Sequence, residues 1–207
     1  MILSPFTVAY DTREQLPFSF ADVRIDRKKA FVMTQRRTLP TGDYSIIGYE
    51  DKVCIERKSL ADLYQTLGKG RERFLRELER MQEMDYAAVV IEASWQQISS
   101  PADDDPFWHS KMHPNSIIGT IVAWSGQFSK TQWKAPGNRH NAENLTFRLL
   151  LNYWKHNASP LDNNDTDASK ENNNSHVAGE QAGSLGEVGC ACEIRVDGIG
   201  HHQRQTE

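Results

Sequence analysis

The chain has 207 residues, 38% hydrophobic and 25% charged, with a formal net charge of −4 at pH 7. No apolar run is long enough to span a membrane, the N-terminus lacks the pattern of a signal peptide, and three cysteines, an odd number, exclude a secreted disulfide framework. We therefore expect a soluble intracellular protein without a membrane partner, with room for one domain and an appendage.

The charges divide the chain into two unequal parts. Residues 1–160 hold 21 Lys and Arg against 19 Asp and Glu, whereas residues 161–207 hold 3 against 9. Residues 162–188 have almost no large apolar side chain, so they cannot bury enough surface to offset the entropy of ordering. The composition predicts a folded domain over residues 1–158 and a mostly disordered acidic tail, rich in Asn, Ser and Gly, over residues 159–207.

The N-terminal part of the domain is predicted to be mainly β-structure. Short apolar and β-branched runs alternate with polar segments, and Pro40-Thr41-Gly42 marks a turn before a hairpin. The predicted elements are a strand at 6–10, a loop with a short helix at 12–29, a strand at 30–37, and hairpin arms at 44–47 and 52–58.

Two helices are expected next. Ser59 is a candidate N-cap, and Ser59-x-x-Asp62 resembles a capping box with Asp in place of Glu. The first helix ends near Gly68-Lys69-Gly70. The second, over residues 71–84, carries the apolar stripe Phe74, Leu78 and Met81.

The C-terminal part of the domain alternates strands and helices. Residues 86–92 form a continuous apolar run, which predicts a strand buried on both faces. The remaining elements are a loop at 99–114 that contains His109 and His113, a helix from Asn115 or Ser116 to 126, an edge strand at 128–133, and a helix at 142–155 capped by Asn141. This order predicts an α/β fold with a central mixed β-sheet flanked by helices.

Three charged residues on the hairpin suggest a site. Residues two apart in a strand share a face, so Glu56 and Lys58 point the same way, and the hairpin brings Asp43 towards Glu56. Two neighbouring carboxylates repel unless a cation joins them, and oxygen ligands suit Mg²⁺ or Mn²⁺. Lys58 can then hold a water or neutralise a phosphate, which suits metal-assisted phosphodiester hydrolysis. The alternative is a solvated cross-strand ion pair worth under about 1 kcal/mol.

The spacing resembles a known signature. "GDY" at residues 42–44 and "ERKSLAD" at residues 56–62 are similar to the GDx…ERKxxxD signature of the XPF-type structure-selective endonucleases. "AYDTREQLPF" and "GRERFLRELERMQEMDYAAVVIEA" resemble the flanking elements of that family. The resemblance covers residues 6–95 well and 115–156 in outline. It implies a restriction-endonuclease-like core and a metal-dependent endonuclease of the PD-(D/E)XK superfamily that acts on branched, flapped or fork DNA.

The resemblance also implies roles for individual residues. Asp43, Glu56 and the backbone carbonyl of Arg57 would ligate Mg²⁺ or Mn²⁺, with Asp11 as a further ligand. Lys58 would position the attacking water and stabilise the charge that develops on the phosphate.

Three further residues receive roles from the same comparison. Glu14 would be a second acidic contributor beside Asp11. Arg13, like Arg57, would either organise the carboxylates or contact the DNA backbone. Asp62 is either a catalytic member of the signature or a helix cap.

The chain departs from the family at its C-terminus. Family members usually carry a tandem helix-hairpin-helix domain that grips DNA and dimerises, and this chain has no room for one. Two alternatives therefore stay open: a catalytically silent DNA-binding subunit of a nuclease complex, or a junction-resolvase or restriction-type nuclease.

Basic clusters predict contacts with DNA phosphates. Gly68-Lys69-Gly70 leads into a helix N-terminus, where backbone N–H groups favour phosphate. The alternative for each cluster is an ordinary solvated face. The predicted DNA-binding residues are Arg13, Arg24, Arg27, Lys28, Lys29, Lys69, Arg71 and Arg73.

Self-association is also predicted. The helix at 142–155 has leucine and aromatic side chains on more than one face, which is more apolar surface than one small sheet need cover. We expect a homodimer through this C-terminal part of the domain. Cys190 and Cys192 in the tail match no common zinc-site spacing.

Overall fold

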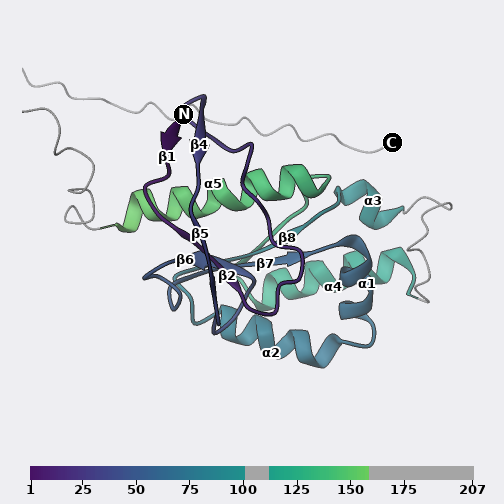
Figure 1. Ribbon diagram of the computed structural model, residues 1–207. Helices are drawn as coiled ribbons and strands as arrows, with labels where there is room; N and C mark the ends of the chain where they lie inside the picture. Colours follow the sequence, from purple (N-terminus) through teal and green to yellow (C-terminus); the bar gives the residue numbers. More distant parts are fainter. Residues whose placement is uncertain (101–111, 159–207) are drawn as a thin grey trace, which may run out of the picture. The chain divides into compact units, whose positions relative to one another are not determined.

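A mixed six-stranded sheet with helices on both faces forms the centre of the computed structural model, which describes residues 1–100 and 112–158 (Figure 1). This is the α/β architecture that the sequence predicts. The strands are β1 (Ile2–Leu3), β2 (Val8–Asp11), β3 (Arg24–Ile25), β4 (Lys28–Phe31), β5 (Thr34–Arg37), β6 (Tyr44–Ile46), β7 (Val53–Lys58), β8 (Tyr86–Ile91) and β9 (Thr131–Lys134). The helices are α1 (Leu60–Leu67), α2 (Arg71–Met81), α3 (Trp95–Ser99), α4 (Pro114–Gln127) and α5 (Arg139–Asn157).

The large sheet has the strand order β5-β2-β6-β7-β8-β9. Strand β6 runs antiparallel to both β2 and β7, whereas the β7–β8 and β8–β9 pairs are parallel. Strand β8 lies between two partners and is buried along nearly its whole length, as its continuous apolar run predicts. Strand β9 is an edge strand, also as predicted.

Each face of the sheet is covered by its own set of helices (Figure 1). Helix α5 covers one face, where Phe147 and Leu150 pack into the same core as Val8 and Tyr44. Helices α1, α2 and α4 cover the other face, and the stripe on α2 is buried there as predicted. None of the helices within the described residues is both long enough and apolar enough to cross a bilayer.

The segment before β5 differs from its prediction. Residues 12–29 contain no helix, and residues 30–37 are not one strand. Instead β3 and β4 form a tight hairpin whose turn residues, Asp26 and Arg27, have φ angles of 48° and 65°. Strands β4 and β5 then belong to different sheets. The prediction failed because the turn places two residues other than glycine in the left-handed region, which no local pattern announces.

Helix caps explain the other differences. Ser59 caps α1 as predicted, since its side chain accepts a hydrogen bond from the backbone N–H of Asp62. Helix α4 is capped by His113, two residues before the predicted Asn115, and α5 is capped by Asn138 rather than Asn141.

Two elements were not predicted at all. Helix α3 begins at a capping box formed by Ser94 and Gln97. Strand β1 contributes only two residues to a small sheet with β4 and β3. Most of the predicted loop, His109 included, lies outside the described residues, as do Cys190, Cys192 and the rest of the tail.

Helix α5 has apolar neighbours on two sides. Its Phe147, Leu150 and Leu151 share one core with residues of the large sheet and with Ile25 and Ala30 of the small β-sheet. The apolar surface that suggested a dimer is therefore largely covered within the chain. Homodimerisation stays a prediction.

The hydroxyl of Tyr44 ties the N-terminal loop to the large sheet, because it accepts a hydrogen bond of 2.9 Å from the buried N–H of Phe18. Replacement of Tyr44 by Phe leaves that N–H without its partner. We expect the free energy of unfolding to fall by about 1–3 kcal/mol, measured by urea denaturation. The control is Tyr86→Phe, whose hydroxyl lies 3.5 Å from Gln132 in an exposed contact. Equal losses in both variants would contradict the role of Tyr44.

Candidate active site

The predicted acidic pair lies where β6 begins and β7 approaches its end. Tyr44 pairs with Ile55 in the antiparallel ladder, so Asp43, one residue before Tyr44, lies opposite Glu56, one residue after Ile55. Directly opposed residues in such a ladder have Cβ atoms about 4.5–5.5 Å apart. The register therefore brings together the two carboxylates that the sequence predicts to be close.

Gly42 allows the chain to reach this position. Its φ is +74°, a conformation that L-residues with a side chain rarely adopt. A Cβ atom at this position would lie 3.1 Å from the Cβ of Cys54 and 3.2 Å from the carbonyl oxygen of Ile55. Both the turn and the close approach to β7 require glycine, which accounts for the glycine before Asp43.

Backbone hydrogen bonds fix the carboxylate of Asp43. Its N–H donates to the carbonyl of Ile55 at 2.9 Å, and its Oδ2 accepts from the N–H of Arg57 at 2.8 Å. One carboxylate oxygen is thus held against strand β7.

Glu56 and Lys58 form an ion pair on the shared face of β7, as their spacing predicts. Glu56 is only 4% exposed. The Lys58 ammonium also lies 4.9 Å from the centre of the Phe74 ring, so α2 helps to hold it. The alternative of a solvated pair does not describe this contact, because both side chains are largely buried.

Burial and mutual repulsion shift the acid–base behaviour of the group. Burial raises the pKa of Asp43 to about 6. Burial and the neighbouring Asp43 carboxylate raise the pKa of Glu56 well above its ordinary value. Burial lowers the pKa of Lys58, but Glu56 and Asp43 outweigh this effect, and the net pKa is raised. A positive charge placed beside the two acids would therefore stabilise their ionised forms.

The donor set fits a divalent cation of the Mg²⁺ type. Asp43 and Glu56 offer oxygen ligands, and the backbone of Arg57 lies next to Glu56. Within residues 1–100 and 112–158, no group of three or more His, Cys, Asp and Glu side chains has an arrangement that could hold a metal. Mg²⁺ commonly takes one or two carboxylates and keeps several waters, so two carboxylates are a sufficient protein share.

A cavity of about 910 Å³ opens over these residues. Its walls carry both acids, Lys58, and several arginines that face the same space. The lining residues are Arg13, Glu14, Gln15, Leu16, Gly42, Asp43, Glu56, Arg57, Lys58, Ser59, Asp62, Arg73, Glu77, Arg80, Glu92 and Arg139. Such a wall of alternating charge can hold a cation on the acids and a phosphate on the arginines.

Arg57 lines the same cavity and pairs with two carboxylates. Its side chain is 11% exposed and pairs with Glu92 at 2.8 Å and with Glu14 at 3.2 Å. Arg139, the first residue of α5, also pairs with Glu92, at 2.7 Å. Of the two predicted roles for Arg57, the geometry favours organising carboxylates over contacting DNA. Glu14 is placed as a partner of Arg57.

Asp11 lies outside the cavity lining, and its role as a metal ligand stays a prediction. Its carboxylate accepts bonds from the Arg13 backbone at 2.8 Å, the Arg13 side chain at 2.6 Å and the Leu39 backbone at 2.8 Å. Burial raises the pKa of Asp11, but these donors outweigh it, and the net pKa is lowered. Asp11 therefore serves as a buried anchor for the loop at residues 12–16.

Asp62 takes part in the cap of α1 and also lines the cavity. Its backbone N–H donates to Ser59 Oγ at 3.1 Å, and its Oδ2 accepts from Ser59 Oγ at 2.7 Å. The residue also lines the cavity. Capping is therefore established by contacts, while a catalytic role stays a prediction.

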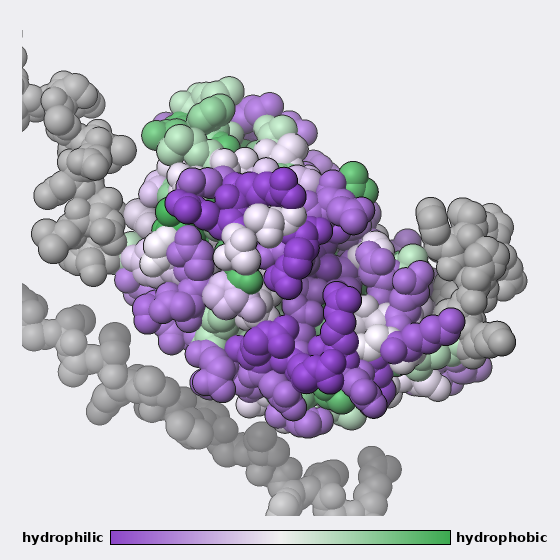
Figure 2. All heavy atoms as spheres, turned by 60° about the horizontal axis from the view of Figure 1, so that its bottom comes forward, coloured by the Kyte–Doolittle hydropathy of each residue, from purple (hydrophilic) through white to green (hydrophobic). Residues whose placement is uncertain are grey.

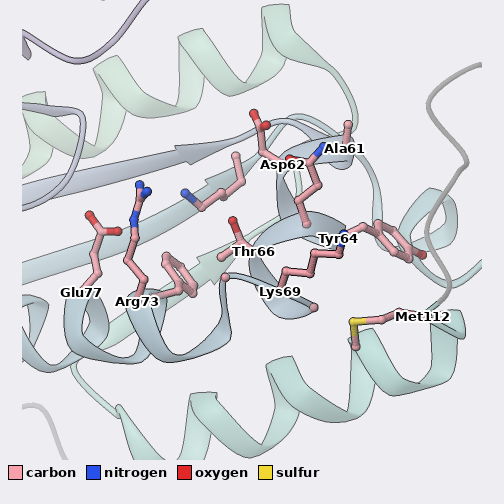
Figure 3. Close-up of a pocket in the computed structure, with 13 residues that line it drawn as sticks. Ala61, Asp62, Tyr64, Thr66, Lys69, Arg73, Glu77 and Met112 are labelled. Atoms are coloured by element: carbon pink, nitrogen blue, oxygen red, sulfur yellow. The ribbon is translucent and has the colours of Figure 1, made fainter.

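A second hollow, of about 980 Å³, adjoins the first (Figure 3). Helix α1, the Gly68–Gly70 turn and helix α2 form its walls, and Lys69 lies at the turn. Asp62, Arg73 and Glu77 line both hollows, as does Lys58. The two spaces are thus neighbours that share these walls.

The predicted DNA-binding residues fall into three groups. Arg13, Lys69 and Arg73 line one or both hollows. Arg71 instead contacts α4, with a hydrogen bond of 3.2 Å to Thr120 and its guanidinium 4.6 Å from the Trp124 ring. The third group, on the β3–β4 hairpin, lies outside both hollows and consists of Arg24, Arg27, Lys28 and Lys29.

Some residues of the cavity were missed by the sequence reasoning. Arg73 was predicted as a DNA contact, but Glu77 and Arg80, which follow it at i+4 and i+7 on α2, were not among the predicted site residues, although their helical spacing was present in the sequence. Strongly hydrophilic residues gather over the side of the molecule on which α2 lies (Figure 2). Glu92 and Arg139 carried no such signal, because only the tertiary fold brings β8 and α5 to the cavity.

Comparison with solved structures confirms the fold. XPF from Aeropyrum pernix, in complex with DNA, matches with a TM-score of 0.52 and 17% sequence identity, over 73% of this chain and 66% of that chain. A second structure of XPF from Aeropyrum pernix gives 0.47 and 15%, over 88% and 70%. A comparison with curated protein sequences finds no match.

The fold is therefore that of an XPF-type nuclease domain. A family model described as the ERCC4 domain matches residues 10–140, which is well over half of the chain and includes all the residues that line the two hollows. The chain belongs to the ERCC4 domain family. Membership confirms the resemblance drawn from residues 42–62.

The acidic pair should lower stability when charged. Because the folded-state pKa of Asp43, about 6, lies above the unfolded value of about 3.9, its ionisation costs stability above pH 6. This cost fades as the pH falls towards 4. In EDTA, Asp43→Asn should therefore raise the free energy of unfolding at pH 8 by about 1–3 kcal/mol and have little effect at pH 4.

The measurement is urea denaturation across this pH range, with Asp51→Asn, an exposed position between β6 and β7, as the control. A gain that is the same at pH 4 and pH 8 would show that folding does not raise the pKa of Asp43.

Proposed function

We propose that the chain is a metal-dependent DNA endonuclease that hydrolyses phosphodiester bonds in branched, flapped or fork DNA, in repair, recombination or replication. The observation that carries this proposal is the pairing of Asp43 with Glu56 across β6 and β7, with Lys58 bonded to Glu56. The family supports nuclease chemistry, and the related XPF was solved with DNA. The metal and the branched substrate are our inference.

Asp43 and Glu56 would hold the cation together with the backbone carbonyl of Arg57. When bound, Mg²⁺ or Mn²⁺ supplies a Lewis acid for the phosphoryl oxygen and lowers the pKa of a bound water. The carboxylates meet this need because burial and mutual repulsion already favour a neighbouring positive charge.

Lys58 would act on the phosphate. Its ammonium group is held between Glu56 and the Phe74 ring, at the rim shared by both hollows. From there it can donate to a phosphate oxygen and stabilise the charge that grows in the transition state. The rigid β7 strand fixes its position.

The arginines would orient the DNA backbone. Arg13, Arg73 and Arg80 line the cavity and are exposed to solvent, whereas Arg57 is tied to Glu14 and Glu92. Arginine forks suit phosphate oxygens and carry no base preference. Binding should therefore be insensitive to sequence and should weaken steeply with salt.

Cleavage of a panel of DNA structures tests the proposal. Purified protein is incubated with flapped, forked, three-way-junction, duplex and single-stranded DNA in Mg²⁺, Mn²⁺ or EDTA. We expect metal-dependent cuts, and losses of roughly a hundredfold or more in Asp43→Asn, Glu56→Gln and Lys58→Met, because each removes an interaction made in the transition state.

Asp51→Asn is the control and should cut at the parental rate. Absence of cleavage on every structure would refute the activity. Parental cleavage by Asp43→Asn and Glu56→Gln would refute the site.

Metal binding can be measured apart from catalysis. Calorimetric titration of Mn²⁺ into the free protein should give heat that disappears in Asp43→Asn, because this variant removes one of two carboxylate ligands. Asp62→Asn should keep the heat, since its side chain is engaged with Ser59. Loss of heat in Asp62→Asn alone would place the cation at α1 instead of β7.

A further inference from the structure

A second basic surface lies away from the two hollows, on the β3–β4 hairpin and α5. Arg24, Arg27, Lys28 and Lys29 are exposed on the hairpin. Arg148, exposed on α5, adds a fifth cation from a distant part of the sequence. The carboxylates near the hairpin cations are Asp22, which pairs with Lys29 at 3.3 Å, and Asp26. Basic groups therefore outnumber acidic ones on this surface.

The surface is grooved. One shallow hollow of about 480 Å³ is lined by Asp22, Arg24, Pro136, His140, Asn141, Asn144, Leu145 and Arg148. Another of about 570 Å³ is lined by Arg24, Ile25, Asp26, Arg27, Arg148 and Leu151. Arg24 and Arg148 belong to both, so the hollows adjoin and form one shallow track, here called the α5 groove.

The α5 groove follows a single face of its helix. His140, Asn144 and Arg148 recur at i, i+4 and i+8, which places them in line along α5. From His140 to Leu151 the helix rises about 17 Å at 1.5 Å per residue. Arg139, the residue before His140, lines the candidate active site. The groove thus begins beside the cavity and leads away from it.

The turn of the β3–β4 hairpin places Arg27 in an unfavourable backbone conformation. Asp26 and Arg27 both have positive φ, in a tight two-residue turn of a kind that usually contains Asn-Gly or Asp-Gly. Aspartate tolerates this conformation, but arginine gains nothing from it in backbone energy. The side chain of Arg27 lines the α5 groove, so its charge is displayed there in spite of the unfavourable backbone.

These features fit the phosphate backbone of a double helix. Duplex DNA carries one charge per about 1.7 Å of axis, and about 17 Å of groove corresponds to roughly five base pairs at ~3.4 Å each. The guanidinium groups of the arginines that line the α5 groove can hydrogen-bond to phosphate oxygens, and the side chains of His140 and Asn144 add further hydrogen-bonding groups.

We propose that the α5 groove binds a duplex arm of the substrate, about five base pairs long, whose end lies at the candidate active site. The inference rests on the proposed function, because both surfaces hold one DNA molecule. It extends that function by assigning Arg24, Arg27 and Arg148 to an arm that is not itself cut. A substrate with such an arm spans two surfaces, whereas a short or single-stranded substrate reaches only the cavity.

Binding in EDTA tests the groove without cleavage. Fluorescence anisotropy compares flapped DNA with a duplex arm of 3 or 14 base pairs. Arg24→Gln/Arg148→Gln should weaken binding of the long-armed DNA about tenfold and change that of the short-armed DNA by less than about twofold. The slope of log K against log salt should fall by about 1.8 for the long arm, at about 0.9 for each phosphate that the variant no longer neutralises. Lys52→Gln/Lys155→Gln, with the same charge change at exposed positions outside the groove, should leave both values unchanged.

Arg27→Gly separates binding from folding. Glycine relieves the turn, so the variant should melt at a higher temperature than the parent, yet it should bind the long-armed DNA about threefold or more weakly. Equal losses in the groove variant and the lysine control, or equal losses on long and short arms, would overturn the proposal. So would competition by polyglutamate as strong as that by duplex, since the groove would then favour acidic protein.

The two hypotheses fail in different ways. If the protein cuts DNA but the arm length has no effect on the groove variant, the α5 groove is wrong and the nuclease assignment stands. If the arm effect is seen but no DNA is cut in any metal, the groove is correct and the catalytic proposal is wrong.

Discussion

The antiparallel register of β6 and β7 is the constraint on which the site depends. It sets Asp43 opposite Glu56, and a shift of one residue would turn one of the two carboxylates to the other face of the sheet. Several features protect this register. Gly42 permits the close approach, the backbone of Arg57 holds the Asp43 carboxylate, and the fully buried Val53 and Ile55 anchor β7 in the core. Favourable packing and hydrogen bonds around the strands thus offset the repulsion between the two carboxylates. Such unfavourable local interactions are typical of functional sites.

The charged groups that line the cavity form two sets with different roles. One set, Asp43, Glu56 and Lys58, contains the acidic pair and its lysine. The other set is a chain of ion pairs from Glu14 through Arg57 to Glu92 and on to Arg139, which lines the same cavity. Because Arg57 lies between Glu56 and Lys58 in sequence, one strand contributes to both sets. Buried ion pairs add little net stability but strongly resist the loss of one partner, which suits a support that must hold one geometry.

Much of this was predictable from sequence, and the failures have physical reasons. The alternation along β7, the apolar run of β8 and the stripe of α2 all follow a period that the sequence displays, and these elements were predicted correctly. The hairpin of β3 and β4 was missed because its turn uses strained residues in place of glycine. Glu92 and Arg139 were missed because they reach the cavity only through the tertiary fold. The hydrogen bonds that Asp11 accepts from Leu39 and Arg13 could not be read from the sequence, because the tertiary fold brings residue 39 beside residue 11.

The thiol behind Gly42 has a practical consequence. Cys54 is fully buried, is the one free cysteine within the described residues, and has a pKa raised above its ordinary value by burial and by Glu56. The side chain of Cys54 packs in the core beneath α1 and α2, so this protonated, inaccessible thiol reacts with alkylating reagents only after these helices have opened away from β7. Cys54 is therefore a natural chemical probe of the helix packing beside the site, and its rate of labelling would measure how often α1 and α2 leave the sheet.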